Sequence, residues 1–233
     1  MKHTVLILIE MIIIMKKYNN IIFDLDGTLI DSSVGIIQSI MHALEKFDIE
    51  VDNKNELLEF IGPPLMDSFQ KYYGFSEEEA ECAIKHYREY FKDKGIFENS
   101  LYDGVEGLLK VLKDRDKKLL IATTKPEVYA IEVIKYYNLD NLFEFIAGSH
   151  LDGRRVDKEE LIRYALESSS LESLNETVMI GDRKYDILGA RKVGIDSIGV
   201  LYGFGDRKEL EDAGANHIVS SPVDALKILT CND

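Results

Sequence analysis

The sequence contains little cysteine, and this scarcity excludes two kinds of site. Of its 233 residues only two are cysteines, Cys82 and Cys231, and neither belongs to a CxxC pair or a Cys/His cluster. We therefore expect neither a structural zinc site nor a disulfide framework. Because isolated cysteines are typical of a reducing compartment, we expect a cytoplasmic protein.

Basic residues are also scarce, with 28 lysines and arginines against 42 acidic residues and a formal net charge of −14. A nucleic-acid polymer is bound through clustered lysines and arginines, so we expect no such partner. A small phosphorylated metabolite needs only a local site and stays compatible with this charge. We expect a monomer or a homodimer.

Apolar runs long enough to span a membrane are absent. The longest run, TVLILIEMIIIM at residues 4–15, is shorter than the roughly 20 apolar residues that cross a bilayer. It also lacks the small-residue cleavage site of a signal peptide, so we expect no stable membrane association. Met15 offers a second start, and we treat residues 1–14 as an N-terminal extension. The alternative is an additional strand, helix or weak membrane contact.

Short apolar runs that are typical of buried strands alternate with helical patterns along most of the chain. We expect strands at 19–23, 118–122, 143–148, 177–180, 197–201 and 217–219. Helical patterns fall at 105–113, 126–137, 158–168 and 184–194. This alternation predicts right-handed βαβ units and hence an α/β fold with a doubly wound parallel sheet.

Residues 32–98 interrupt the alternation, because they show only helical patterns. Helices are expected at 34–46, at 55–62 and at 76–91, the last opening with a capping box of Ser76 and Glu79. We interpret this stretch as a helical cap inserted after the first strand. The predicted division is therefore a core of residues 15–31 and 99–233 and a cap of residues 32–98.

Polar residues follow four of the predicted strands, where ligands bind in open α/β sheets. They are Asp24 and Asp26, then Thr123, Thr124 and Lys125, then Lys158 after a loop, and finally Asp182 and Asp186. The predicted fold brings these strand ends to one edge of the sheet. We therefore expect one site built from carboxylates, hydroxyls and a lysine.

These residues resemble the four motifs of the haloacid dehalogenase-like hydrolase superfamily. DLDGT at 24–28 matches the first motif and GDRKYD at 181–186 the fourth, while Thr123 and Lys158 match the second and third. The resemblance covers about residues 18–230. Stretches such as FIGPPLMDSF and MIGDRKYDILGAR also resemble a bacterial 5′-nucleotidase-like subgroup, which neighbours phosphoglycolate phosphatases and β-phosphoglucomutases.

The resemblance implies a role for each residue in phosphoryl transfer. Asp24 would attack phosphorus and form an aspartyl-phosphate. Asp26 would protonate the leaving oxygen and then take a proton from the attacking water. Thr123, Thr124 and Lys158 would bind the transferring phosphoryl group.

The resemblance also implies a metal cofactor, most simply Mg²⁺, which prefers oxygen ligands. Its expected ligands are a carboxylate oxygen of Asp24, the backbone carbonyl of Asp26, and Asp182. Asp186 would act from outside this ligand set and orient Lys158 or a water on the metal. A cation there would offset the repulsion between the crowded carboxylates.

The expected function is Mg²⁺-dependent hydrolysis of a small phosphomonoester, with nucleoside 5′-monophosphates favoured by the subgroup. The alternatives are a phosphatase for 2-phosphoglycolate or another small organic phosphate, a phosphomutase, and a non-catalytic binding protein on the same fold. Three further positions stay open. Residues 62–64 are either a turn between helices or a loop over the site. Arg154 and Arg155 are expected on the surface, with substrate contact as the alternative, and Arg183 is expected to support the fourth motif.

Overall fold

Six parallel strands form the centre of the core, in the order β5-β4-β1-β6-β7-β8. They are β1 (Asn20–Phe23), β4 (Lys118–Pro126), β5 (Phe143–Ser149), β6 (Thr177–Gly181), β7 (Asp196–Val200) and β8 (His217–Val219). The computed structural model describes residues 17–231 and confirms the predicted parallel sheet. The predicted extension of residues 1–14 lies outside the described residues.

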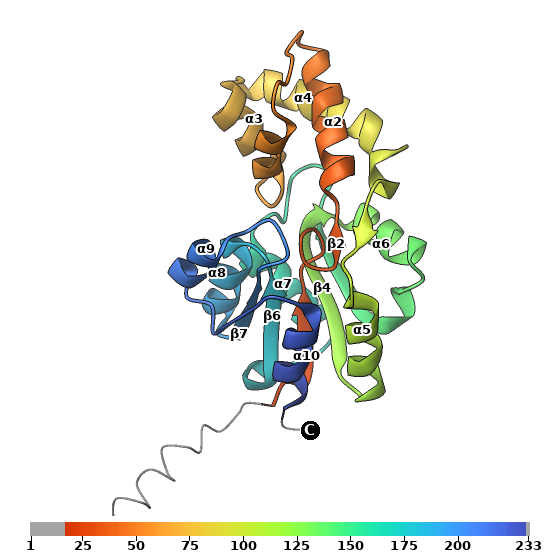
Figure 1. Ribbon diagram of the computed structural model, residues 1–233, viewed down its shortest axis with the longest axis vertical. Helices are drawn as coiled ribbons and strands as arrows, with labels where there is room; N and C mark the ends of the chain where they lie inside the picture. Colours follow the sequence, from red (N-terminus) through yellow and green to blue (C-terminus); the bar gives the residue numbers. More distant parts are fainter. Residues whose placement is uncertain (1–16, 232–233) are drawn as a thin grey trace, which may run out of the picture.

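Helices cover both faces of this sheet (Figure 1). They are α5 (Val105–Asp114), α6 (Glu127–Tyr136), α7 (Lys158–Ser168), α8 (Lys184–Val193), α9 (Arg207–Ala213) and α10 (Pro222–Thr230). Successive strand residues point to opposite faces, so Ile21 and Phe23 pack in the cluster that contains the apolar residues of α5 and α10. Ile22 packs in the other cluster, with α7 and α8. Burial on both faces explains why the strands are continuous apolar runs.

A helical cap stands over the carboxyl ends of the strands, as the upper part of Figure 1 shows. It consists of α2 (Ser33–Glu45), the 3-10 helix η1 (Lys54–Phe60), α3 (Leu65–Tyr73), α4 (Glu77–Phe91) and the 3-10 helix η2 (Gly95–Phe97). The capping box of Ser76 and Glu79 is present at the start of α4. The predicted domain boundaries stay a prediction, but the inserted helical cap itself is confirmed.

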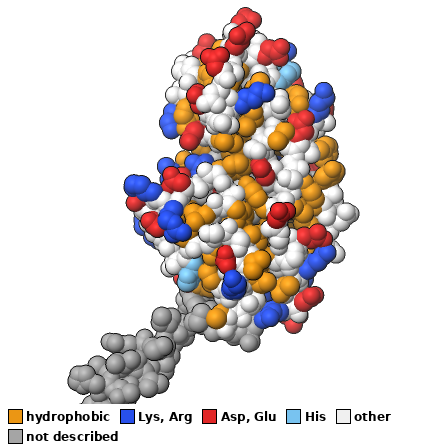
Figure 2. All heavy atoms as spheres, in the orientation of Figure 1, with side chains coloured by type: hydrophobic (Ala, Val, Ile, Leu, Met, Phe, Trp, Pro, Cys, Tyr) orange, Lys and Arg blue, Asp and Glu red, His pale blue; other side chains and the backbone are white. Residues whose placement is uncertain are grey.

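Some elements lie outside those predicted. A two-stranded antiparallel sheet of β2 (Ile30–Asp31) and β3 (Ser100–Leu101) joins the two chain segments that lead into and out of the cap. Two-residue strands are too short to show a sequence period. The helix α9, with seven residues, is barely long enough to show a helical one. No helix among residues 17–231 is long and apolar enough to cross a membrane. Acidic side chains gather at the outer end of the cap (Figure 2), in line with the negative net charge.

Candidate active site

The carboxyl ends of three neighbouring strands bring the predicted site residues together. β1 lies between β4 and β6, with Phe23 level with Ile121 on one side and Ile180 on the other. The residues that follow, among them Asp24 and Asp182, therefore leave the sheet at the same edge. The convergence expected from the strand pattern is a direct consequence of this order.

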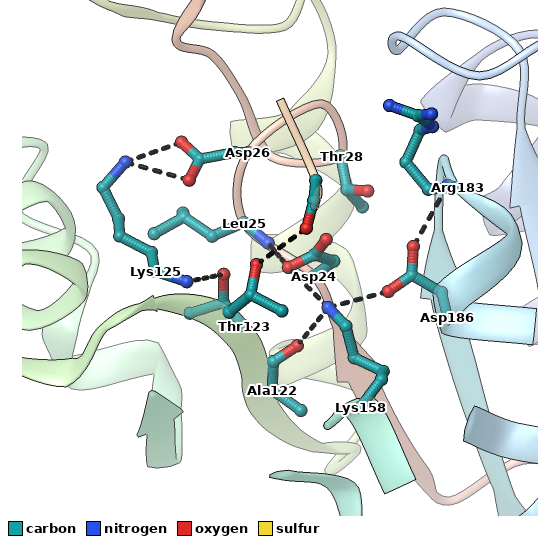
Figure 3. A network of polar contacts seen from close by, with 12 residues as sticks. Asp24, Leu25, Asp26, Thr28, Ala122, Thr123, Lys125, Lys158, Arg183 and Asp186 are labelled. Carbon is teal, nitrogen blue, oxygen red and sulfur yellow. Dashed lines mark hydrogen bonds and ion pairs between the residues drawn. The ribbon is translucent and has the colours of Figure 1, made fainter. Parts of the chain in front are cut away.

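Lys158 lies at the centre of the polar network (Figure 3). It begins α7, where the side chain of Asp157 accepts the backbone N–H groups that open the helix. The Lys158 ammonium is 3.0 Å from Asp24 Oδ1 and 2.8 Å from Asp186 Oδ1, and it donates to the Ala122 carbonyl at 3.1 Å. Burial alone would lower the pKa of Lys158, but Asp186 and then Asp24 raise it above its ordinary value. The buried lysine is therefore held as a cation.

Three buried carboxylates cluster beside this lysine. Asp24, Asp182 and Asp186 each offer an oxygen atom within 4.8 Å of the others. Burial raises the pKa of Asp24 to about 6, although Lys158 and the Leu25 N–H bond at 2.7 Å to Asp24 Oδ1 act against it. Burial and the neighbouring carboxyls raise the pKa of Asp182 well above its ordinary value. One ammonium cannot balance three carboxylates, and an oxygen-lined acidic cluster of this kind fits a divalent cation.

The loop after β1 is shaped so that Asp182 can approach it closely. Gly27 has φ +84°, and a Cβ atom there would lie 2.2 Å from Asp182 Oδ2. Asp182 also accepts the Phe204 N–H at 2.8 Å and the Thr28 hydroxyl at 3.3 Å. The glycine-rich turn at 203–206, to which sequence reasoning gave no role, therefore helps to fix this carboxylate.

Asp26 points away from Asp24 and Asp186 and pairs with Lys125 (Figure 3). The Lys125 ammonium lies 2.7 and 2.9 Å from the two Asp26 oxygens, and it stands 5.1 Å from the centre of the Phe91 ring. Sequence analysis gave Lys125 no function. Its only signal was its place directly after the two strand-end threonines, in a chain where lysine is common.

The two threonines lie differently. Thr123 is buried, and its hydroxyl accepts the Lys125 N–H at 3.3 Å. Thr124 is half-buried and donates to the carbonyl of Gly62 in the cap at 3.4 Å. Thr124 thus joins the core to the cap, whereas Thr123 is buried within the core.

A cavity of about 620 Å³ opens between the cap and the core, with Asp24 and Asp26 among its lining residues. The cap contributes residues 60–67 and part of α4, and the core contributes residues 124–126 and 149–153, among others. The segment 62–64 lines this cavity, so it is both a turn between helices and a loop over the site.

Two arginines join the cap to the core beside the cavity. Arg88 of α4 donates to the Leu151 carbonyl at 2.5 Å. Arg183 donates to the Ile61 carbonyl at 2.5 Å and pairs with Glu209 at 3.0 Å. Arg183 therefore supports the fourth motif, as expected, and also holds the cap loop.

The other two arginines considered from the sequence lie outside the cavity lining. Arg154 is exposed and pairs with Asp152 at 2.7 Å. Arg155 is mostly buried; it pairs with Glu127 at 3.2 Å, and its guanidinium lies 3.7 Å from the centre of the Tyr164 ring. Arg155 therefore braces the loop, and only Arg154 meets the surface expectation.

The chain is similar to known proteins over most of its length. The model of the haloacid dehalogenase-like hydrolase family matches residues 21–200. The chain belongs to the haloacid dehalogenase-like hydrolase family. This agrees with the strand-end carboxylates and lysine described above.

Similar members of the family are known from curated and solved proteins. A 5′-nucleotidase of Pseudomonas aeruginosa is 45% identical over 201 residues, which cover 86% of this chain and 90% of that protein. The tyrosine-protein kinase PtkA of Mycobacterium tuberculosis is 37% identical and is covered to 67%. The crystal structure of a predicted phosphatase from Clostridium acetobutylicum has a TM-score of 0.87 and 50% identity, with 91% and 97% of the two chains covered. The family, the 5′-nucleotidase and the predicted phosphatase identify the protein as a phosphatase, a phosphoric monoester hydrolase.

Proposed function

We propose that the protein hydrolyses nucleoside 5′-monophosphates through a phospho-aspartate on Asp24. The observation that carries this proposal is the position of Asp24. Its carboxylate lines the cavity and is bonded to the Lys158 ammonium at 3.0 Å within an otherwise acidic cluster. Such a carboxylate can reach a phosphate ester in the cavity while the Lys158 ammonium balances its negative charge.

In the first step an Asp24 oxygen attacks phosphorus, and the bond from phosphorus to the ester oxygen breaks. Asp26 gives its proton to the departing oxygen, so the alcohol leaves neutral. In the second step water attacks the phosphorus of the aspartyl-phosphate, and the bond to Asp24 breaks. Asp26 takes the proton of that water, which restores both carboxyl groups and releases phosphate.

The surrounding residues hold charge during these steps. Lys158 balances negative charge beside Asp24, and Asp186 holds Lys158 in place through its 2.8 Å ion pair. Thr123 and Thr124 are proposed to donate hydrogen bonds to phosphoryl oxygens. Lys125 must release Asp26, at least in part, for Asp26 to exchange protons with substrate.

Asp24, Asp182 and the backbone carbonyl of Asp26 would hold the Mg²⁺ ion, and the Asp186 carboxylate is close enough to join them. When bound, the ion supplies positive charge that lets an anionic carboxylate meet an anionic phosphate. The net negative balance of this buried cluster supports a metal cofactor here.

Two observations support nucleotides as the substrate class. The cavity, at about 620 Å³, has room for much more than a phosphate group. Its lining includes the aromatic rings of Phe60, Tyr87, Phe91 and Tyr129, on which a base or sugar can pack. The 5′-nucleotidase among the relatives supports the same class.

The test is phosphate release from a panel of esters, with Mg²⁺ and with EDTA, using Asp24→Asn as the inactive control. The panel holds nucleoside 5′-monophosphates, 2-phosphoglycolate and a sugar phosphate. We expect Mg²⁺-dependent release with the highest kcat/KM for nucleotides. A preference for 2-phosphoglycolate would keep the mechanism and overturn the substrate class. An active Asp24→Asn enzyme would overturn the mechanism.

A further inference from the structure

Tyr87 is a mostly buried tyrosine of the cavity lining that the mechanism does not use. Among residues 17–231 the two most deeply buried tyrosines are Tyr18, 2% exposed, and Tyr87, 8% exposed. The Tyr18 hydroxyl donates to Asp196 at 2.7 Å. The Tyr87 hydroxyl has no hydrogen-bond partner in this described part of the chain, and the residue lines the active-site cavity.

An unpartnered hydroxyl at such a position calls for a reason. The Tyr87 oxygen is not among the sealed, unpaired side-chain atoms of residues 17–231, so it stays open to the cavity, and the hydroxyls of buried tyrosines usually find partners. A phenylalanine would supply the same ring without a hydroxyl that needs a partner. Packing of the cap therefore explains the ring of Tyr87 but not its oxygen, which faces a cavity where a ligand can bind.

The ring of Tyr87 is held firmly. Tyr87 and Phe91 lie one turn apart on α4, and their rings stack at 5.3 Å with an angle of 15°. Phe91 in turn meets the edge of Tyr129 at 5.4 Å and the Lys125 ammonium at 5.1 Å. A ring fixed in this way presents its hydroxyl in a defined place, which lowers the entropy lost when a ligand bonds to it.

The chain of contacts also places Tyr87 near the acid of the proposed mechanism. Lys125, which touches Phe91, is bonded to both oxygens of Asp26. Burial raises the pKa of Tyr87 well above its ordinary value, and the Asp26 charge adds to this effect. In the proposed mechanism Asp26 protonates the ester oxygen as it leaves. The Tyr87 hydroxyl, which the cap contributes, then lies on the side of Asp26 where the rest of the departing alcohol would bind.

We propose that the Tyr87 hydroxyl forms a hydrogen bond with a sugar hydroxyl of the departing nucleoside and so selects against nucleotides whose sugar lacks hydroxyls. This inference rests on the proposed function, because it concerns the alcohol that the enzyme releases. A site built to bond a substrate hydroxyl rejects the analogue that lacks it, since the protein group is then left unpaired. Tyr87 is thereby a specificity-determining residue contributed by the cap.

The experiment compares a ribonucleoside 5′-monophosphate with its 2′,3′-dideoxy analogue in the wild type and in Tyr87→Phe. We expect the variant to lose about 10- to 100-fold in kcat/KM for the ribonucleotide. The dideoxy analogue should lose less than about twofold, so the wild-type preference collapses. Tyr90→Phe is the matched control, because Tyr90 lies on the same helix and its hydroxyl donates to Glu98 at 3.1 Å outside the cavity lining.

Three results would overturn this inference alone, each with a wild type that hydrolyses nucleotides. They are an equal loss on both substrates in Tyr87→Phe, no loss on either, and a wild type that does not prefer the ribonucleotide. A wild type that hydrolyses other esters in the panel but no nucleotide would overturn the proposed substrate class and this inference with it. The two failures are therefore distinguishable in one set of assays.

Discussion

The two walls of the cavity are built in different ways. On the core wall, charged groups are paired at close range, as Lys158 is with Asp24 and Asp186 and Lys125 is with Asp26. The cap wall consists largely of apolar and aromatic side chains, with the free hydroxyl of Tyr87 among them. This difference fits the proposed function, in which the core carries out the phosphoryl transfer and the cap recognises the leaving group.

The backbone supports the core wall more tightly than the cap wall. The core residues follow directly from strands whose register is fixed by neighbours on both sides. The cap rings are carried by helices and by the segment 60–67, and they contact one another, for example Phe60 with Phe69 at 5.2 Å. Aromatic contacts tolerate exchange for other apolar groups far better than a buried ion pair tolerates loss of one partner.

The comparison predicts its largest effect at Asp24. Asp24→Asn should lower kcat by at least about 10⁴-fold, because the nucleophile is lost while the shape of the side chain is kept. Phosphate release under saturating substrate measures it, with circular dichroism as the check on folding. The control is Asp67→Asn, an exposed acid of the cap wall that lines the same cavity, for which we expect less than a tenfold loss. Equal losses in the two variants would contradict the proposal that the core wall carries the phosphoryl transfer.

Removal of the metal should have the next largest effect. EDTA should lower phosphate release by at least about 10³-fold, and Mg²⁺ should restore it, because positive charge at the acidic cluster contributes several kcal/mol to phosphoryl transfer. Mg²⁺ should also raise the Tm of the wild type by relieving repulsion between the buried carboxylates. Asp182→Asn should show a smaller rise. Full activity in EDTA would contradict the cluster as a metal site.

Two glycines with positive φ, one in the core and one in the cap, allow the backbone of the two regions to be compared. Gly27 has φ +84° and a Cβ there would meet Asp182, whereas Gly74 at the end of α3 has φ +67° and open space around it. Both changes to alanine should lower the free energy of unfolding by about 1 kcal/mol or more through backbone strain. Only Gly27→Ala should also lower kcat/KM, by about 10²-fold, since it displaces a carboxylate of the site. Urea unfolding and phosphate release measure the two effects separately.

The smallest effect is expected at the outer end of the cap. Ser76 accepts the Glu79 N–H at 3.2 Å, and the Glu79 side chain accepts the Ser76 N–H at 2.8 Å. Ser76→Ala should lower the free energy of unfolding by about 1 kcal/mol through loss of the helix cap. The kcat/KM should stay within about twofold, since α4 remains packed on α2. A large loss of activity would show that the cap wall is as sensitive as the core wall.

Much of the fold could be predicted from the sequence, since buried parallel strands are continuous apolar runs with helical patterns between them. All six core strands were predicted to within a few residues, although β4 runs on to Pro126. The pair of β2 and β3 and the helices α3, α9 and α10 were not predicted. The first two are two residues long, so only their pairing distinguishes them from loops.

The site could be predicted where a residue's place along the chain also fixes its place in space. Asp24, Asp182 and Lys158 come together because their strands and helix do. The pairing of Asp26 with Lys125 and the place of Tyr87 in the cavity depend on side-chain directions and on how the cap sits over the core. Neither has a sequence period or spacing that distinguishes it from an ordinary surface or packing residue.

The sequence by itself therefore determined the sheet, the inserted helices and the residues at the strand ends, because these follow from local patterns of burial and charge. Tertiary structure alone decided that Asp186 and not Asp26 joins the buried cluster of Asp24 and Asp182, that Lys125 pairs with Asp26, and that the Tyr87 hydroxyl is left unpartnered in the cavity. The physical reason is that contacts between the cap and the core join residues far apart in the sequence, since Thr124 and Arg183 of the core bond to the cap loop across 62 and 122 positions. Their energies depend on distances of a few ångströms, which no local pattern encodes.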